Sequence, residues 1–110
     1  MGSKSQRKGR RAEIELAGLL QGYGIPAQVG DPLNYGSQPD IKGVAGVHCE
    51  VKRCEQLRLS EWMAQATRDA EKFKDGAPTI FHRKSRSGWV AIMCLEDWAE
   101  LYSRSRKCNT

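Results

Sequence analysis

The stretch SQPDIKGVAGVHCEVKR, residues 37–53, alternates apolar and polar side chains over two short segments, a period that is typical of β-strands. Residues 44–46 join the two segments, and the glycine at the last position of this connection adopts a left-handed backbone at little cost. We therefore predict a β-hairpin in which Asp40 lies directly opposite Glu50, with one apolar face toward the core. The apolar face carries Ile41, Val47, Cys49 and Val51, and the polar face carries Lys42, His48, Glu50 and Lys52.

Further helices and strands are expected on both sides of this hairpin. Apolar residues recur at helical spacing over 6–21 and over 60–75, where Ser60 is expected to be the N-cap and Gly76 to end the helix. Residues 25–29, 78–82 and 88–95 are predicted strands, and 96–102 a short helix. The resulting order, α-β-β-β-α-β-β-α, predicts an α/β domain in which helices flank a mixed sheet.

The length of 110 residues predicts a single domain over 1–110. Within it, residues 1–8 are expected to form a basic N-terminal arm, and residues 103–110 a flexible tail. No apolar segment resembles a signal peptide or approaches the roughly 18 residues of a membrane span. We therefore expect the four cysteines to be free thiols, and the protein to be cytoplasmic with no membrane partner.

Basic residues outnumber acidic ones and lie in clusters. Lysine and arginine total 18 against 13 aspartates and glutamates, a formal net charge of +5. The clusters lie near the start of the chain, at 83–86 and at 104–107. Such patches favour a polyanion, most often nucleic acid, although a solvated surface explains the charge alone equally well.

The facing pair of Asp40 and Glu50 needs an explanation, because cross-strand partners have Cβ atoms only about 4.5–5.5 Å apart. Two carboxylates at this distance repel each other unless a cation lies between them or one binds a proton. Oxygen ligands suit Mg²⁺ or Mn²⁺. Lys52 lies on the same face as Glu50, where its ammonium group reaches a phosphate oxygen or a water. The alternative is a solvated polar face with diagonal ion pairs.

The motif PDIKGVAGVHCEVK resembles the signature of the PD-(D/E)XK nuclease superfamily. The resemblance rests on Pro39-Asp40, a spacer, and then Glu50-Val51-Lys52, all within the predicted hairpin and its apolar flanks. It implies a restriction-endonuclease-like fold and metal-dependent hydrolysis of phosphodiester bonds.

A second segment, RKGRRAEIELAGLL at 7–20, resembles the opening helix of archaeal-type Holliday junction resolvases and their phage relatives. In that pattern the acidic residue of the helix aligns with Glu13, although helical geometry alone does not choose between Glu13 and Glu15. The two resemblances together imply a catalytic set that uses Mg²⁺ or Mn²⁺ as cofactor. Its ligands would be Glu13, Asp40, Glu50 and the Val51 carbonyl, with Lys52 orienting or activating the water.

The resemblance also implies DNA as the partner, and a four-way (Holliday) junction as the substrate. A junction with two-fold symmetry needs two matched cuts, so we expect a homodimer of one-site domains. The alternatives are a nuclease of the same superfamily that acts on other branched or linear DNA, and a non-catalytic basic DNA-binding module. The expected DNA contacts are Arg7, Lys8, Arg10, Arg11, Ser37 in a glycine-serine loop, Gln65, Arg83, Lys84 and Arg86.

Other conspicuous side chains receive structural interpretations. A zinc site at His48, Cys49 and Cys54 lacks a second Cys/His pair with finger spacing, so Cys49 is expected to be a core thiol. His82 is interpreted as a solvated loop residue. The tryptophans are expected in the core: Trp62, Trp89 and Trp98.

Overall fold

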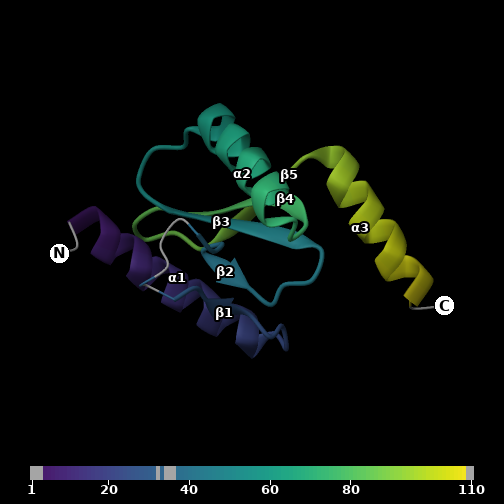
Figure 1. The fold of residues 1–110 in the computed structure, drawn as a ribbon, viewed down its shortest axis with the longest axis horizontal. Helices are drawn as coiled ribbons and strands as arrows, with labels where there is room; N and C mark the ends of the chain where they lie inside the picture. Colours follow the sequence, from purple (N-terminus) through teal and green to yellow (C-terminus); the bar gives the residue numbers. More distant parts are fainter. Residues whose placement is uncertain (1–3, 32, 34–36, 109–110) are drawn as a thin grey trace.

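The structure is a computed structural model, which describes residues 4–31, 33 and 37–108. It is an α/β domain in which helices flank a five-stranded mixed sheet (Figure 1). The types and order of the elements agree with the prediction. They are α1 (Lys4–Gly22), β1 (Gln28–Val29), β2 (Ile41–Lys42), β3 (Val47–Arg53), α2 (Leu59–Phe73), β4 (Ala77–Arg83), β5 (Val90–Met93) and α3 (Leu95–Cys108).

The strands lie in the order β1-β2-β3-β4-β5. β3 and β4 are parallel, and the other neighbouring pairs are antiparallel. Parallel strands need a crossover connection, which α2 supplies between β3 and β4. The hairpin of β2 and β3 therefore lies at the centre of the sheet, between β1 and β4.

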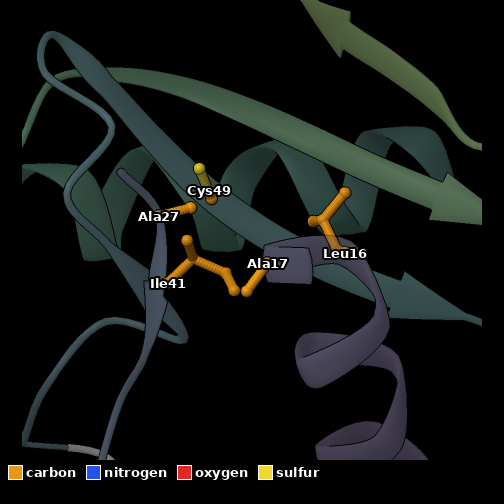
Figure 2. Packing of buried hydrophobic residues seen from close by; sticks show 5 residues of the cluster. All are labelled: Leu16, Ala17, Ala27, Ile41 and Cys49. Atoms are coloured by element: carbon orange, nitrogen blue, oxygen red, sulfur yellow. The ribbon is translucent and has the colours of Figure 1, made fainter. Parts of the chain in front are cut away.

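One face of the sheet packs against α1. Leu16 and Ala17 of this helix meet Ile41 and Cys49 of the hairpin, with Ala27 beside them (Figure 2). These side chains are almost completely buried, and Val47 and Val51 pack against them. The predicted apolar face of the hairpin is confirmed, and so is the assignment of Cys49 to the core.

The other face of the sheet is covered by α2, through Trp62 and Ala66 packed on Ile80. The polar residues of β3 point to this side, because successive strand residues alternate between faces. His48 and Glu50 are consequently buried, at 1% and 5% exposure. The alternative of a solvated polar face is therefore wrong for the middle of β3, where both faces are covered.

The helix ends differ from those predicted from the sequence. α1 begins at Lys4, so residues 4–8 continue this helix, and α3 runs to Cys108 instead of ending near 102. Lysine, arginine and glutamine are good helix formers, so basic ends extend a helix readily. α2 begins at Leu59 and ends at Phe73, before the expected Gly76, and its C-cap Lys74 has a left-handed φ of 53°. Ser60 thus lies inside the helix, and Arg58 occupies the N-cap position without a side-chain cap.

The turn between β2 and β3 depends on two glycines. Gly43 has φ +89°, and a Cβ built on it would lie 2.1 Å from the carbonyl oxygen of Pro26. Gly46 has φ +80° with open space around it, as expected for the last position of the connection. This turn closes the hairpin in the register that pairs Ile41 with Cys49.

None of the helices in the described part combines the length and the apolar composition that crossing a bilayer would require.

Candidate active site

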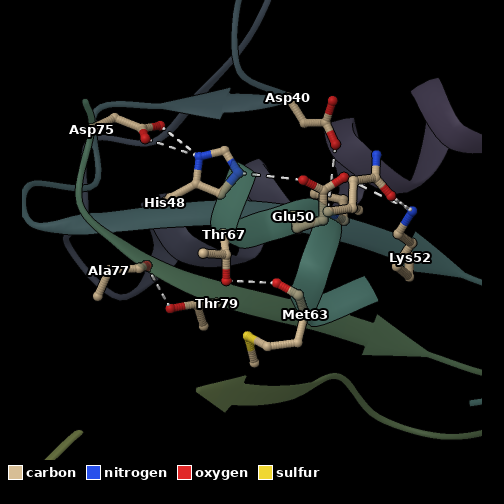
Figure 3. Close-up of polar contacts among 11 residues, drawn as sticks. Asp40, His48, Glu50, Lys52, Met63, Thr67, Asp75, Ala77 and Thr79 are labelled. Atoms are coloured by element: carbon tan, nitrogen blue, oxygen red, sulfur yellow. Dashed lines mark hydrogen bonds and ion pairs between the residues drawn. The ribbon is translucent and has the colours of Figure 1, made fainter. Parts of the chain in front are cut away.

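Asp40 and Glu50 come together at the hairpin, as the sequence predicts. The pairing of Ile41 with Cys49 sets a register that, continued by one residue, places Asp40 opposite Glu50. The backbone N–H of Val51 donates a hydrogen bond to Asp40 Oδ2 at 3.4 Å. Figure 3 shows Glu50 between His48 and Lys52 along β3, with Asp40 beside it. The two acids therefore share one face of the sheet.

A third carboxylate reaches this pair from α1. Glu13 is only 6% exposed, and the negative charges of Asp40 and Glu50 both raise its pKa. Arg10 lies 3.9 Å from Glu13 and partly offsets this repulsion. The three acids thus come from α1, from the residue before β2 and from β3.

The structure also separates Glu13 from Glu15, which the sequence does not. The Glu15 carboxylate accepts hydrogen bonds from Arg83 at 2.7 and 2.8 Å and from the Trp89 ring nitrogen at 3.1 Å. These partners hold Glu15 against the β4–β5 end of the sheet, whereas Glu13 turns inward. Of the two acids, Glu13 is the one that belongs to the carboxylate cluster.

Burial and mutual repulsion raise the pKa values of two of these acids. The pKa of Glu13 rises to about 7, first because burial removes its hydration and then because Asp40 and Glu50 are negatively charged. The pKa of Asp40 rises to about 6, again through burial first and the Glu50 charge second. The cluster therefore has a shortage of positive charge, which is the electrostatic condition that favours binding of a cation.

The Lys52 ammonium group lies next to this cluster and is held in place. Its Nζ donates to Gln65 Oε1 at 2.9 Å, lies 3.9 Å from Glu50 Oε2 and sits 5.9 Å from the centre of the Trp62 ring. Gln65 comes from α2, on the same side of the sheet. The amide of Gln65 therefore fixes the position of Lys52. The expected contact of Gln65 with DNA stays a prediction.

His48 is a member of the site that the sequence interpretation missed. One ring nitrogen, Nδ1, lies 2.9 Å from both oxygens of Asp75, and the other, Nε2, lies 3.3 Å from Glu50 Oε1. Burial by itself lowers the pKa of His48, but the hydrogen bonds to Glu50 and Asp75 outweigh it and raise the pKa to about 8. A protonated His48 donates to both carboxylates and holds Glu50 in place. The sequence signal for this role was that His48, Glu50 and Lys52 are every second residue of β3, which places their side chains on the same face of the sheet.

A second group of potential ligands overlaps the first. Single ligand atoms of His48, Glu50 and Asp69 lie within 4.8 Å of one another. Glu50 belongs to both groups, and Nε2 of His48 already makes a hydrogen bond to it. Among the described residues, the group of His48, Glu50 and Asp69 is the one whose ligand atoms lie so close together, and it does not include Glu13 or Asp40. Binding of Mg²⁺ by the oxygen ligands Glu13, Asp40 and Glu50 stays a prediction.

Some of the expected DNA contacts also make contacts within the domain. Arg10 donates to the carbonyl of Gly30, and Arg83 is paired with Glu15, so both have structural partners. Arg83 binds Glu15, one helical turn after Arg11, so this part of α1 lies beside the end of β4 that precedes residues 84–86. The exposed candidates are Arg11, Ser37, Lys84 and Arg86, whereas Gly36 and the side chains of Arg7 and Lys8 lie outside the described part.

Two aromatic expectations are wrong. His82 is buried in β4, where Nε2 lies 2.8 Å from the Cys54 carbonyl and the ring tilts against Trp62, so it is not a solvated loop residue. Trp98 is half exposed on α3 instead of lying in the core, whereas Trp62 and Trp89 pack in the two apolar clusters.

Comparisons with protein-family models, curated proteins and solved structures gave no match to this chain. The functional assignment therefore depends on the geometry of the site and on the sequence motifs.

Proposed function

We propose that this protein is a metal-dependent DNA endonuclease of the PD-(D/E)XK type, and that its preferred substrate is a four-way DNA junction. One observation carries the proposal: Asp40 and Glu50 face each other across the hairpin with the Lys52 ammonium group 3.9 Å from Glu50, and the buried Glu13 of α1 is near enough for the charges of both acids to raise its pKa. A solvated face or a structural ion pair needs no such gathering of carboxylates. The element order, with parallel β3 and β4 joined through α2, supports a restriction-endonuclease-like fold.

The donor set suits Mg²⁺ or Mn²⁺ as the cofactor. Three carboxylates provide hard oxygen ligands, and the Val51 carbonyl is a further candidate because the backbone N–H of the same residue donates to Asp40. The raised pKa values of Glu13 and Asp40 fall when a divalent cation replaces their protons. A bound ion of this kind polarises a phosphate and lowers the pKa of water.

The remaining groups bind and orient the DNA backbone at the site. Lys52, fixed by Gln65, places its positive charge where the phosphate gains negative charge during attack by water. His48, oriented by Asp75, keeps Glu50 Oε1 engaged and leaves Oε2 directed toward Lys52. Arg11, Lys84 and Arg86 provide exposed positive charge for further phosphate contacts.

The test is a cleavage assay on the full chain with four DNA substrates of equal length: a four-way junction, a Y-fork, a linear duplex and a single strand. Each is incubated with Mg²⁺, Mn²⁺ or EDTA. We expect cleavage only with a divalent ion, fastest on the junction. Asp40→Asn should reduce the rate at least about a hundredfold without weakening DNA binding in EDTA. Glu61→Gln, which changes an exposed acid on α2, is the matched control and should cleave normally.

The other readings predict different results. Equal cleavage of all branched or linear substrates would replace the junction with a broader DNA substrate. DNA binding that is indifferent to divalent ions, with no cleavage of any substrate, would indicate a binding module and contradict the proposal. Undiminished cleavage by Asp40→Asn would contradict the metal site itself.

A further inference from the structure

His48 is a buried imidazole that lies among three carboxylates. It is 1% exposed; both oxygens of Asp75 lie 2.9 Å from its Nδ1, and Glu50 Oε1 lies 3.3 Å from its Nε2. Figure 3 shows the ring between these two acids. Asp69 of α2 adds the third carboxylate, because one of its oxygens lies within 4.8 Å of ligand atoms of both His48 and Glu50. Three acids around one imidazole leave this part of the interior short of positive charge.

Asp75 determines which ring nitrogen of His48 is available. Both oxygens of Asp75 face Nδ1, so this nitrogen carries a proton and donates it to the carboxylate. Nε2 is then the nitrogen that faces Glu50. Metal-binding histidines almost always have this arrangement, in which one N–H donates to a carboxylate and thereby directs the other nitrogen at the ion. What lies between Nε2 and the acids has to be a cation, either a proton or a metal ion.

The spacing of the ligand atoms fits one small divalent ion. Two ligand atoms at about 2.1 Å from the same ion lie roughly 3.0–3.4 Å apart when they occupy neighbouring positions of an octahedron or a tetrahedron. The 3.3 Å between His48 Nε2 and Glu50 Oε1 falls within this range. Asp69 is only partly buried, so rotation of its side chain shortens its distance to the other two ligand atoms from the present 4.8 Å limit.

We propose that His48 Nε2, Glu50 Oε1 and the Asp69 carboxylate form a second cation site, which takes a divalent transition-metal ion such as Mn²⁺ or Zn²⁺. One imidazole nitrogen and two carboxylate oxygens suit such ions, whereas Mg²⁺ prefers oxygen ligands alone. Three protein ligands leave coordination positions for water. Because the ligands come from β3 and α2, a bound ion ties this helix to the sheet.

This site is separate from the oxygen-only set of the proposed function, although both sets include Glu50. The two oxygens of Glu50 face different neighbours: Oε1 lies toward His48, and Oε2 lies 3.9 Å from the Lys52 ammonium group. One carboxylate therefore serves both sets as a bridge. The inference does not rest on the proposed nuclease activity, because it concerns binding of an ion to the chain without DNA.

A proton is the main competing occupant of Nε2. A protonated His48 donates to Glu50 and to Asp75, and these two contacts need no metal. The third acid favours the ion, because Asp69 is turned from α2 toward the same two ligand atoms, which a proton shared between His48 and Glu50 does not require.

The test uses Mn²⁺ as the probe, because the exposed Cys94 thiol competes for Zn²⁺ but is a poor ligand for Mn²⁺. Mn²⁺ is added to the full chain at about pH 8.5, where protons compete less for His48. Electron spin echo envelope modulation detects coupling between Mn²⁺ and a coordinated imidazole nitrogen. We expect this coupling in the wild type, and also in Asp40→Asn, in which the oxygen-only set has lost a ligand. His82, the other histidine of the chain, is engaged through Nε2 by the Cys54 carbonyl.

Asp69→Asn is the decisive variant, because it keeps the size of a partly buried side chain and removes its charge. In the Asp40→Asn background it should weaken Mn²⁺ binding at least about tenfold in titration calorimetry, since even the loss of a residue that only supports a ligand costs this much. The nitrogen coupling should disappear with it. Glu71→Gln in the same background changes an exposed acid of α2 and is the matched control, which should bind Mn²⁺ normally. His48→Gln, checked for folding by circular dichroism, should also lose the coupling.

Three results would overturn the inference. The first is Mn²⁺ binding by the wild type without nitrogen coupling, or no binding at all. The second is equal affinity for Mn²⁺ in Asp69→Asn and Glu71→Gln. The third is loss of the coupling in Asp40→Asn, because His48 would then bind an ion only together with the oxygen-only set. A chain that shows the expected coupling but cleaves no DNA would contradict the proposed nuclease and support this second site.

Discussion

Neutralising Glu13 should stabilise the folded protein at neutral pH. Its pKa rises from 4.5 to about 7 on folding, chiefly because the ionised carboxylate loses its hydration and also because Asp40 and Glu50 are negative. Each pKa unit corresponds to about 1.4 kcal/mol, so ionised Glu13 costs the fold about 3 kcal/mol at high pH. Below pH 4.5 the group is protonated in both states and costs nothing. The cost appears as pH rises from 4.5 and is complete above 7.

Glu13→Gln removes this cost while keeping the size of the side chain. Urea unfolding in EDTA should show the variant more stable than the wild type by about 1–3 kcal/mol at pH 8, with no gain at pH 4.5. Glu15→Gln is the matched control on the same helix. Because Glu15 is partly exposed and paired with Arg83, its loss should lower the stability by at most about 1 kcal/mol at both neutral and higher pH.

Binding of a divalent ion should also increase the stability of the wild-type protein. At a concentration ten times the dissociation constant, Mg²⁺ or Mn²⁺ should add about 1.4 kcal/mol to the free energy of unfolding, and much less in Glu13→Gln. A Glu13→Gln variant with no gain in stability at pH 8 would refute the conclusion that Glu13 lies ionised and buried in a carboxylate cluster. So would an equal, pH-dependent gain in Glu15→Gln.

Three further predictions follow from single contacts. Gln65→Ala should reduce the initial rate of DNA cleavage with Mg²⁺ about tenfold, because Lys52 loses its 2.9 Å hydrogen-bond partner. The control variant Gln56→Ala, on the exposed loop before α2, should cleave like the wild type. Gly43→Ala should lower the free energy of unfolding in urea by more than about 2 kcal/mol, because its Cβ meets the Pro26 carbonyl oxygen. Gly46→Ala, with open space around its Cβ, should lower it by only about 1 kcal/mol. Equal losses in the two variants would contradict the close approach of Gly43 to Pro26. Native protein treated with iodoacetamide at pH 8 should be alkylated at the exposed Cys94 but not at Cys49, because burial raises the pKa of the Cys49 thiol to about 12. Mass spectrometry of peptides identifies the alkylated cysteines. Alkylation of Cys49 in the native protein would contradict its burial.

Much of this arrangement could be predicted from local patterns in the sequence. Alternation at Ile41 to Lys52 and the glycine at 46 are properties of neighbouring residues, and they predict both the hairpin and the opposition of Asp40 and Glu50. Helical spacing of apolar residues predicts α1 and α2 in the same way. The ends of the helices were less predictable, because basic and polar residues at 4–8 and 103–108 are compatible with both helix and coil.

The residues that only the folded chain explains are those whose partners are distant in the sequence. His48 becomes part of the site because Asp75 reaches it from beyond α2, and His82 is buried because the Cys54 carbonyl accepts its hydrogen bond. Arg83, which looks like a free basic residue in the sequence, is held by Glu15 across 68 positions. Local periodicity contains no information about these contacts.

The sequence by itself determined the strand register that makes two acids face each other, because side chains in a strand alternate every second residue. Only the tertiary structure decided that Glu13, rather than Glu15, joins them, and that Trp98 stays outside the core. The physical reason is that both glutamates are equally compatible with the helix. The choice between them is made by Arg83 and Trp89 on another part of the sheet, which attract Glu15 and leave Glu13 to face the carboxylates.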